Sequence, residues 1–415
     1  MQAVARRWGS VAGALGFLAW MALAAVRTLP PPALLPPPGQ STLPLAYYPW
    51  AYAHLSYSDI LTLYGGRHLA SHALPIVQQA IEYPVLLDLV MWIAAWVPGI
   101  VGYFFATAAL LALSGLVALR AFRAVAPTRW WAFAASPLIA AYGLLNWDLF
   151  GIVWLAASWW AYRANRPGWT GVLVALGTSA KLFPVISWPF MAWAWWTSGR
   201  RRDAALLTLC LLLTLVAVNA PFAWANWHNW TQFVRYNSRR LAIADLWVLA
   251  WPQIRPHTVD LLSLGLVLVM GLVALRAVGR GWDPVRATAV VFTGWMIANK
   301  VFSPQYMLWV LAFGVLAEWP LWALGVVTLG GIADDVNSFG SLAVHALFPR
   351  TNPLRRLVRH RLFRWGLVVR YASLAASGLA GLTAGPRPSA AHIAPGRSPM
   401  RYSEFEDAGR GDPRR

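Results

Sequence analysis

The sequence is poor in charge. Asp, Glu, Lys and Arg make up 12% of its 415 residues, against about 25% in ordinary soluble domains. Hydrophobic residues make up 59% of the chain, and the mean hydropathy is +0.51. A surface of this composition cannot be kept in water, and helices satisfy their backbone polar groups internally in lipid. The sequence therefore predicts an all-α polytopic membrane protein.

Acidic residues and cysteine are also scarce. Only 15 Asp and Glu stand against 34 Lys and Arg, for a formal net charge of +19. Most arginines fall in short clusters between apolar runs, which is typical of the positive-inside pattern and favours contact with membrane lipids rather than nucleic acid. The single cysteine, Cys210, excludes an intramolecular disulfide. The histidines show no ligand spacing, so we expect no metal.

The arginine clusters predict the topology. An uncleaved first helix runs from Trp8 to Val26, after Arg6 and Arg7, with its N-terminus in the cytoplasm. If the later clusters are also cytoplasmic, the polar passages over 27–99 and 221–257 are external. The short apolar run within the first passage is then a re-entrant or interfacial helix.

These segments predict the domain organisation. We expect about eleven spans, with one membrane domain over residues 1–383 and a disordered tail over residues 384–415. Near the end of the domain, a span from Trp319 to Ile332 would leave Asp334 outside.

Charged residues beside the spans are the first candidates for a functional site, because burying a charge in a membrane is costly. The topology depends on the arginine clusters between spans. It nevertheless places one set of other charged residues together on the external face: Asp59, Arg67, Glu82, Asp148, Lys181, Lys300 and Asp334.

A polar site at the membrane surface suits a substrate that is half lipid, such as a sugar on polyprenyl phosphate. The leaving phosphate is already ionised, so one carboxylate that takes the proton of the acceptor hydroxyl is enough. Glycoside hydrolysis, in contrast, uses two carboxyl groups. A cation must bind the phosphate. We therefore predict Asp59 as the general base, with Lys181 and either Lys300 or Arg67 at the phosphate.

Each of these residues also has a purely structural interpretation. Asp59 could cap a short helix, and Glu82 could begin the next helix and pair with an arginine. Asp148 could cap the helix that it begins. Lys181 and Lys300 could be interfacial lysines whose amines reach water.

Five stretches carry a resemblance to a known family. Over about residues 50–310 and in this order, they resemble glycosyltransferase family 87, the actinobacterial polyprenol-phosphate-mannose-dependent mannosyltransferases of the GT-C class. The stretches are Tyr57-Ser58-Asp59-Ile60 with Leu63-Tyr64, Glu82-Tyr83-Pro84-Val85-Leu86, Asn146-Trp147-Asp148, Ala180-Lys181-Leu182-Phe183-Pro184 and Lys300-Val301-Phe302-Ser303-Pro304-Gln305-Tyr306.

The resemblance implies a GT-C fold in the cell membrane, with large external loops and an active site facing the periplasm or cell exterior. It implies inverting transfer of mannose from polyprenyl phosphate to a glycolipid or lipoglycan acceptor, without cofactor or metal, and it places the general base on Asp59. We then expect the substrate to contact Tyr57, Tyr64, Arg67, Glu82, Asp148, Lys181, Lys300, Gln305 and Tyr306. The chain departs from the family pattern in its short 85–99 connection and its strongly basic 350–364 segment.

Two other functions compete with this one. A transporter or flippase of a lipid-linked glycan should show repeat symmetry and charges near the middle of the membrane, whereas the charges here gather at one face. A non-catalytic subunit of a cell-envelope assembly complex would not require Asp59.

Overall fold

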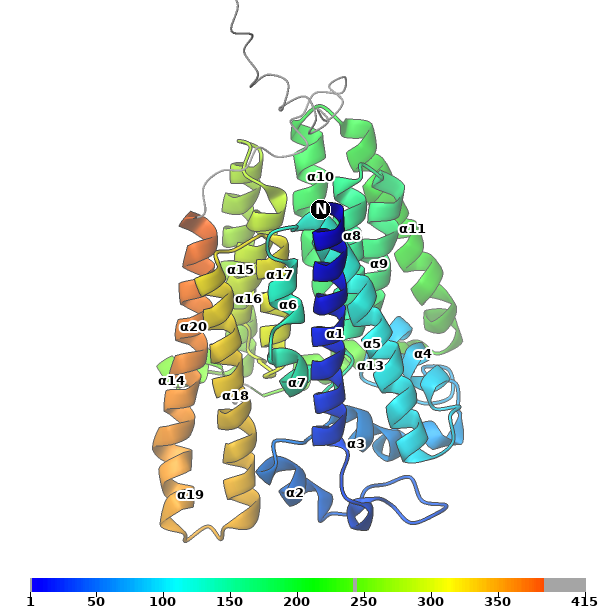
Figure 1. The fold of residues 1–415 in the computed structure, drawn as a ribbon, viewed down its shortest axis with the longest axis vertical. Helices are drawn as coiled ribbons and strands as arrows, with labels where there is room; N and C mark the ends of the chain where they lie inside the picture. The colour runs from blue at the N-terminus through cyan, green and yellow to red at the C-terminus, as the bar shows by residue number, and fades with distance from the viewer. Residues whose placement is uncertain (1, 242–244, 384–415) are drawn as a thin grey trace, which may run out of the picture.

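The computed structural model describes residues 2–241 and 245–383. Within these ranges the chain forms helices and no β-strand, arranged as a bundle (Figure 1). This confirms the prediction of an all-α polytopic membrane protein. The predicted C-terminal tail lies outside the described residues.

The helices vary widely in length, and prolines and polar caps set many of their starts. The first part of the chain forms α1 (Gln2–Thr28), η1 (Pro32–Leu34), α2 (Tyr47–Ala53), α3 (Asp59–Gly66), η2 (Leu69–Ser71), α4 (Val85–Ala94) and α5 (Gly99–Val125). The middle part forms α6 (Trp130–Ala134), α7 (Leu138–Tyr142), α8 (Asp148–Arg163), α9 (Pro167–Ala180), η3 (Phe183–Ile186), α10 (Ser187–Thr197), α11 (Arg201–Ala225), α12 (Trp227–Trp230) and α13 (Gln232–Arg239). The last part forms α14 (Leu246–Ala250), α15 (Pro256–Val278), α16 (Pro284–Ala298), α17 (Tyr306–Leu316), α18 (Leu321–Leu347), α19 (Pro353–Leu357), η4 (Val358–Leu362) and α20 (Phe363–Thr383).

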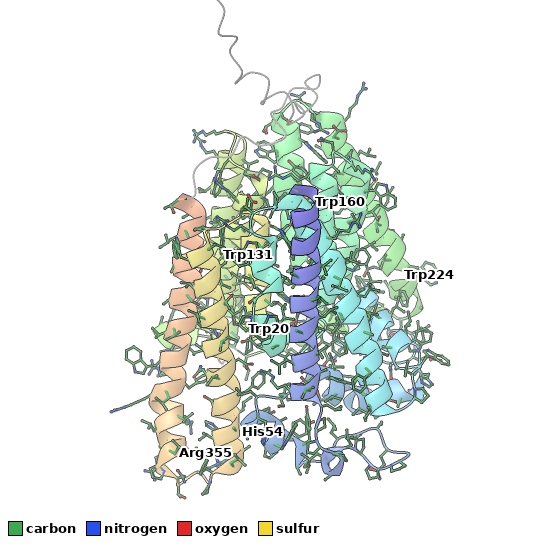
Figure 2. All side chains as sticks on the ribbon, in the orientation of Figure 1. Trp20, His54, Trp131, Trp160, Trp224 and Arg355 are labelled. Atoms are coloured by element: carbon green, nitrogen blue, oxygen red, sulfur yellow. The ribbon has the colours of Figure 1, made fainter. Side chains whose placement is uncertain are left out.

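In the part of the chain that the structure describes, four helical segments are long and apolar enough to cross a membrane: residues 9–28 of α1, and all of α5, α11 and α15. Other helices are short. The 16 residues of α8 span about 24 Å, less than the roughly 30 Å of a hydrocarbon core. Trp131, Trp160 and Trp224 lie on the outside of the bundle (Figure 2), exposed by 45%, 43% and 94%, as expected of rings that contact lipid. The total of about eleven spans stays a prediction.

The centre of the bundle lies around α8 and α17. Every residue of α17 from Met307 to Leu316 is buried, and Trp147, just before α8, and Trp159, in its second half, are fully buried. A helix that is apolar on all sides belongs in the interior. Side chains on the first turns of α8 and α17 therefore pack against the buried centre of the bundle.

The two ends of the bundle differ. The turns after α5, α8, α10 and α15 lie at the end where the chain begins, whereas α2, α3 and α19 lie at the opposite end, here called the distal end (Figure 1). An ion pair joins two of these turns, those after α8 and α15: Arg163 donates to Asp283 at 2.7 Å. The arginine-bearing turns that set the predicted topology thus share one end.

The helix that carries the predicted span from Trp319 does not end at Ile332. α18 continues as one 27-residue helix, with Asp334 and Asp335 inside it and exposed by 0% and 3%. Asp334 pairs with Arg370 on α20, and Asp335 pairs with Arg27 on α1 at 3.2 Å. Because each buried carboxylate has a cationic partner, the charges do not interrupt the helix.

Candidate active site

The chain docks the start of α3 onto the segment that precedes α8. Ser58 caps α3: its hydroxyl accepts from the Ile60 N–H at 3.2 Å and donates to the Leu144 carbonyl at 2.6 Å. The Asp59 N–H donates to the Leu145 carbonyl at 2.8 Å. These bonds fix the first residue of α3 beside Asn146 and the start of α8.

A single network of hydrogen bonds links the two carboxylates and the lysine. Asp59 Oδ1 accepts from the Tyr57 hydroxyl at 3.0 Å, and Oδ2 accepts from Asn146 Nδ2 at 2.7 Å. The Asn146 oxygen accepts from Lys181 Nζ at 2.6 Å. Lys181 Nζ also lies 3.3 Å from Asp148 Oδ1, in an ion pair. Asn146 is therefore the hub that joins Asp59 to the Lys181–Asp148 pair.

Tyr83 completes the network. Asn146 Nδ2 lies 2.8 Å from the Tyr83 hydroxyl, and Lys181 Nζ lies 5.0 Å from the centroid of the Tyr83 ring, a cation–π distance. One aromatic side chain thus contacts both the amide and the ammonium and restrains each of them.

Burial separates the members of this network. Asn146, Asp148 and Lys181 are exposed by 3%, 1% and 7%, whereas Asp59 is partly exposed. Burial of the carboxyl group raises the pKa of Asp59; hydrogen bonds from Asn146 and Tyr57 and the charge of Lys181 offset this only in part. Asp59 is therefore the partly exposed carboxylate of the network, and its pKa lies above that of an ordinary carboxylate.

Stacked aromatic rings form one wall beside Asp148. Trp309 Nε1 donates to Asp148 Oδ1 at 2.9 Å, and the Tyr306 and Trp309 rings stack with centroids 4.1 Å apart. Phe183, just after Lys181, stacks on the other side of Trp309 at 4.3 Å. The wall fixes the carboxylate that holds Lys181.

The other predicted site residues have partners of their own. Arg67 forms a two-pronged ion pair with Glu82, with both N–O distances 2.5 Å. Lys300 pairs with Asp260 at 2.8 Å. Tyr64 is 4% exposed and stacks on Tyr103 of α5 at 4.9 Å.

The structure thus brings five of the predicted residues together: Tyr57, Asp59, Asp148, Lys181 and Tyr306. Arg67 and Glu82 form a separate pair, and Tyr64 lies in the core. Gln305 is 7% exposed and directly precedes α17.

Sequence reasoning gave no role to three residues of the network. Asn146 and Tyr83 stand in the polar stretches beside Asp148 and Glu82, and this position could have indicated that they belong to the site. Trp309 stands in an apolar run and carries no such signal. Within residues 2–241 and 245–383, no group of three or more His, Cys, Asp or Glu side chains is placed to hold a metal ion.

Comparison with known proteins identifies the family of this chain. The model of glycosyltransferase family 87 matches residues 82–304, a segment that contains Asn146, Asp148, Lys181 and Lys300 and begins after Asp59. Searches of curated proteins and of solved structures returned no match. Because the match covers more than half of a helical membrane protein, the chain belongs to glycosyltransferase family 87 and is a membrane glycosyltransferase.

Proposed function

We propose that this glycosyltransferase moves a hexose, mannose by the family resemblance, from a polyprenyl-phosphate donor to a lipid-linked glycan. In the proposed reaction the acceptor oxygen forms a bond to the anomeric carbon while the bond from that carbon to the phosphate oxygen breaks. Asp59 takes the proton of the acceptor hydroxyl, and the bonding electrons leave with the phosphate. A single displacement inverts the anomeric configuration.

The environment of Asp59 supports this role. Both of its carboxylate oxygens accept hydrogen bonds from neutral groups, Tyr57 and Asn146, while the nearby ammonium forms its ion pair with Asp148. The carboxylate is thus oriented without a cation in direct contact, and its raised pKa favours proton uptake. Its partial exposure leaves room for the acceptor hydroxyl.

Lys181 is our candidate for contact with the phosphate. A lysine ammonium has three N–H donors, of which Asn146 and Asp148 engage two. The third is available to a phosphate oxygen of the donor. Because Asp148 neutralises the charge of this lysine, we assign Lys181 a directional contact rather than the full compensation of the phosphate charge.

The external orientation of the site is part of the proposal. The arginine-bearing turns share the end of the bundle where the chain begins, and α3 lies toward the distal end (Figure 1). The positive-inside rule then favours the distal end as external. The basic segment over 350–364, which joins α18 to α20 at the distal end, is the exception to this bias.

Asp59→Asn tests the assignment of the base. The change preserves size and removes the proton acceptor, so sugar transfer from a polyprenyl-phosphate donor in membranes should fall by about 10²-fold or more, with expression unchanged. Asp203→Asn is the matched control, since Asp203 pairs with Arg200 at the other end of the bundle and should keep full activity. Full activity of Asp59→Asn would refute the role. Movement of a lipid-linked glycan by the wild type without any sugar transfer would favour a flippase instead.

A further inference from the structure

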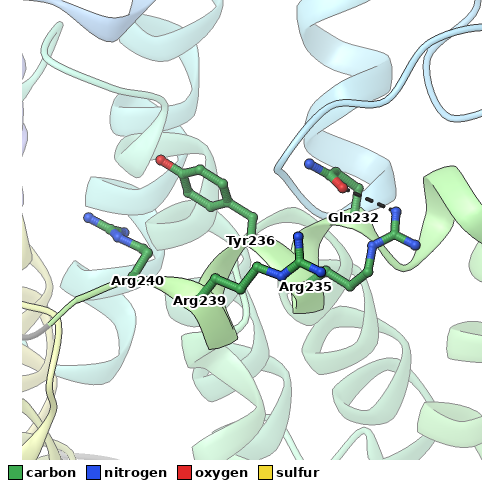
Figure 3. Close-up of a pocket in the computed structure, with 5 residues that line it drawn as sticks. All are labelled: Gln232, Arg235, Tyr236, Arg239 and Arg240. Atoms are coloured by element: carbon green, nitrogen blue, oxygen red, sulfur yellow. Dashed lines mark hydrogen bonds between the residues drawn. The ribbon is translucent and has the colours of Figure 1, made fainter. Parts of the chain in front are cut away.

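A second polar feature lies on the segment between α11 and α15. It is a cavity of about 260 Å³ whose lining comes from α13 and the residue after it (Figure 3). The lining residues are Gln232, Arg235, Tyr236, Arg239 and Arg240. We call it the α13 pocket.

Among the described residues, the lining of the α13 pocket has three guanidinium groups and no carboxylate. Arg235 is held by groups that carry no negative charge: it contacts the His228 ring at 2.9 Å and donates to the Gln232 side chain at 3.1 Å. Arg240 lies over the Tyr236 ring at 5.9 Å. None of these partners cancels the positive charge, so the pocket attracts an anion.

The three cations that the sequence predicted for the site differ in this respect. Lys181 pairs with Asp148, Arg67 with Glu82 and Lys300 with Asp260. Each of these positive charges is already balanced by a carboxylate. The arginines of the α13 pocket, rather than these three residues, can therefore neutralise a phosphate that carries one or two negative charges.

Tyr306 joins the α13 pocket to the candidate active site, and Lys300 ties α13 to the segment that precedes α17. Lys300 Nζ donates to the Ser238 carbonyl in α13 at 3.1 Å. Arg240 interacts with the Tyr306 side chain, whose ring stacks on Trp309, and Trp309 donates to Asp148. The pocket is thus one aromatic pair away from the carboxylate that holds Lys181.

We propose that the α13 pocket binds the phosphate group of a lipid substrate through Arg235, Arg239 and Arg240. The inference rests on the proposed function, because it concerns the substrates of the same site. A guanidinium presents paired N–H donors that match phosphate oxygens. The volume suits a phosphate headgroup, so the polyprenyl chain and the sugar lie outside the pocket. The phosphate belongs to the sugar donor or to an anionic lipid acceptor.

Steady-state kinetics separate these sources. Arg239→Gln removes one charge, and the KM for the phosphate-bearing substrate should rise roughly tenfold or more, with little change in kcat. Arg239→Lys should recover part of the loss. A rise in the KM of the donor assigns its phosphate to the pocket, and a rise in the KM of the acceptor assigns the acceptor's phosphate. Arg255→Gln, an exposed arginine of the same segment outside the pocket, should change neither.

A binding measurement keeps the test independent of catalysis. Purified wild-type protein should bind farnesyl phosphate more tightly than farnesol in a tryptophan-fluorescence titration, and Arg235→Gln/Arg239→Gln should abolish the difference. Equal binding of the two ligands by the wild type, or an undiminished difference in the variant, would overturn the proposal. If Asp59→Asn remains fully active while these arginine effects appear, the assignment of the base fails and the phosphate pocket stands.

Discussion

The pair of Lys181 and Asp148 gives the sharpest test of how the site is built. Its two side chains are exposed by 9% and 1%, with 3.3 Å between Nζ and Oδ1. Removing one member of a buried ion pair leaves the other charge buried without a partner, which lowers the free energy of unfolding by about 3–5 kcal/mol. Lys181→Met keeps most of the side-chain volume, so its main effect is to leave the Asp148 charge with the N–H of Trp309 as its remaining donor.

A second substitution isolates the electrostatic part of that cost. Asp148→Asn removes the stranded charge, so the double variant should be more stable than Lys181→Met alone. The stability that the double variant loses should be smaller than the sum of the two single losses, by on the order of 1–3 kcal/mol. Tyr83 would lose its cation–π contact in both Lys181 variants, so that loss cancels in the comparison.

The assay is thermal unfolding of the four purified proteins in one detergent at fixed lipid content. Lys181→Met should lower the apparent melting temperature by several degrees, and Asp148→Asn in the same chain should restore part of the loss. A Lys181→Met variant that unfolds at the wild-type temperature would show that the pair is not buried as an ion pair. Strictly additive losses in the double variant would show that the two residues do not interact.

Three further predictions use other parts of the structure. In Tyr57→Phe, Asp59 loses a hydrogen bond that stabilises its ionised form, so its pKa rises and the acidic limb of the kcat/KM profile moves to higher pH; an unmoved limb would contradict the contact. At Gly115 a Cβ would overlap the Phe17 ring, so Gly115→Ala should destabilise the α1–α5 contact by about 1–3 kcal/mol in a melting experiment, whereas Gly16→Ala, with open space around it, should not. A reporter fused after α9 should read out as external, and a cytoplasmic readout would break the predicted topology.

Much of the helical organisation could be read from the sequence because lipid imposes simple rules. Apolar runs predicted long helices such as α5 and α11, and the arginine clusters predicted which turns share an end. Asp59, Asp148 and Lys181 could be expected on one side of the membrane, and the structure places them in one network. Their roles in catalysis stay predictions.

The partners of these residues could not be read from the sequence. Pairing of Asp148 with Trp309 joins positions 161 residues apart, and nothing in the apolar run around Trp309 marks it as a donor. The continuation of α18 past Asp334 depends on Arg370, which follows 36 residues later. Local patterns report periodicity and charge, whereas the neutralisation of a buried charge depends on how distant helices pack.

The Asn146 side chain separates the Asp59 carboxylate from the Lys181 ammonium and sets how strongly the one charge acts on the other. A lysine ammonium can only donate, so its bond to the Asn146 oxygen forces the amide NH₂ toward the carboxylate. The side chain therefore cannot flip without losing both bonds. Direct contact between ammonium and carboxylate would lower the pKa of Asp59 and weaken it as a base. The Asn146 amide therefore fixes the orientation of the Asp59 carboxylate through a hydrogen bond and at the same time separates it from the Lys181 ammonium.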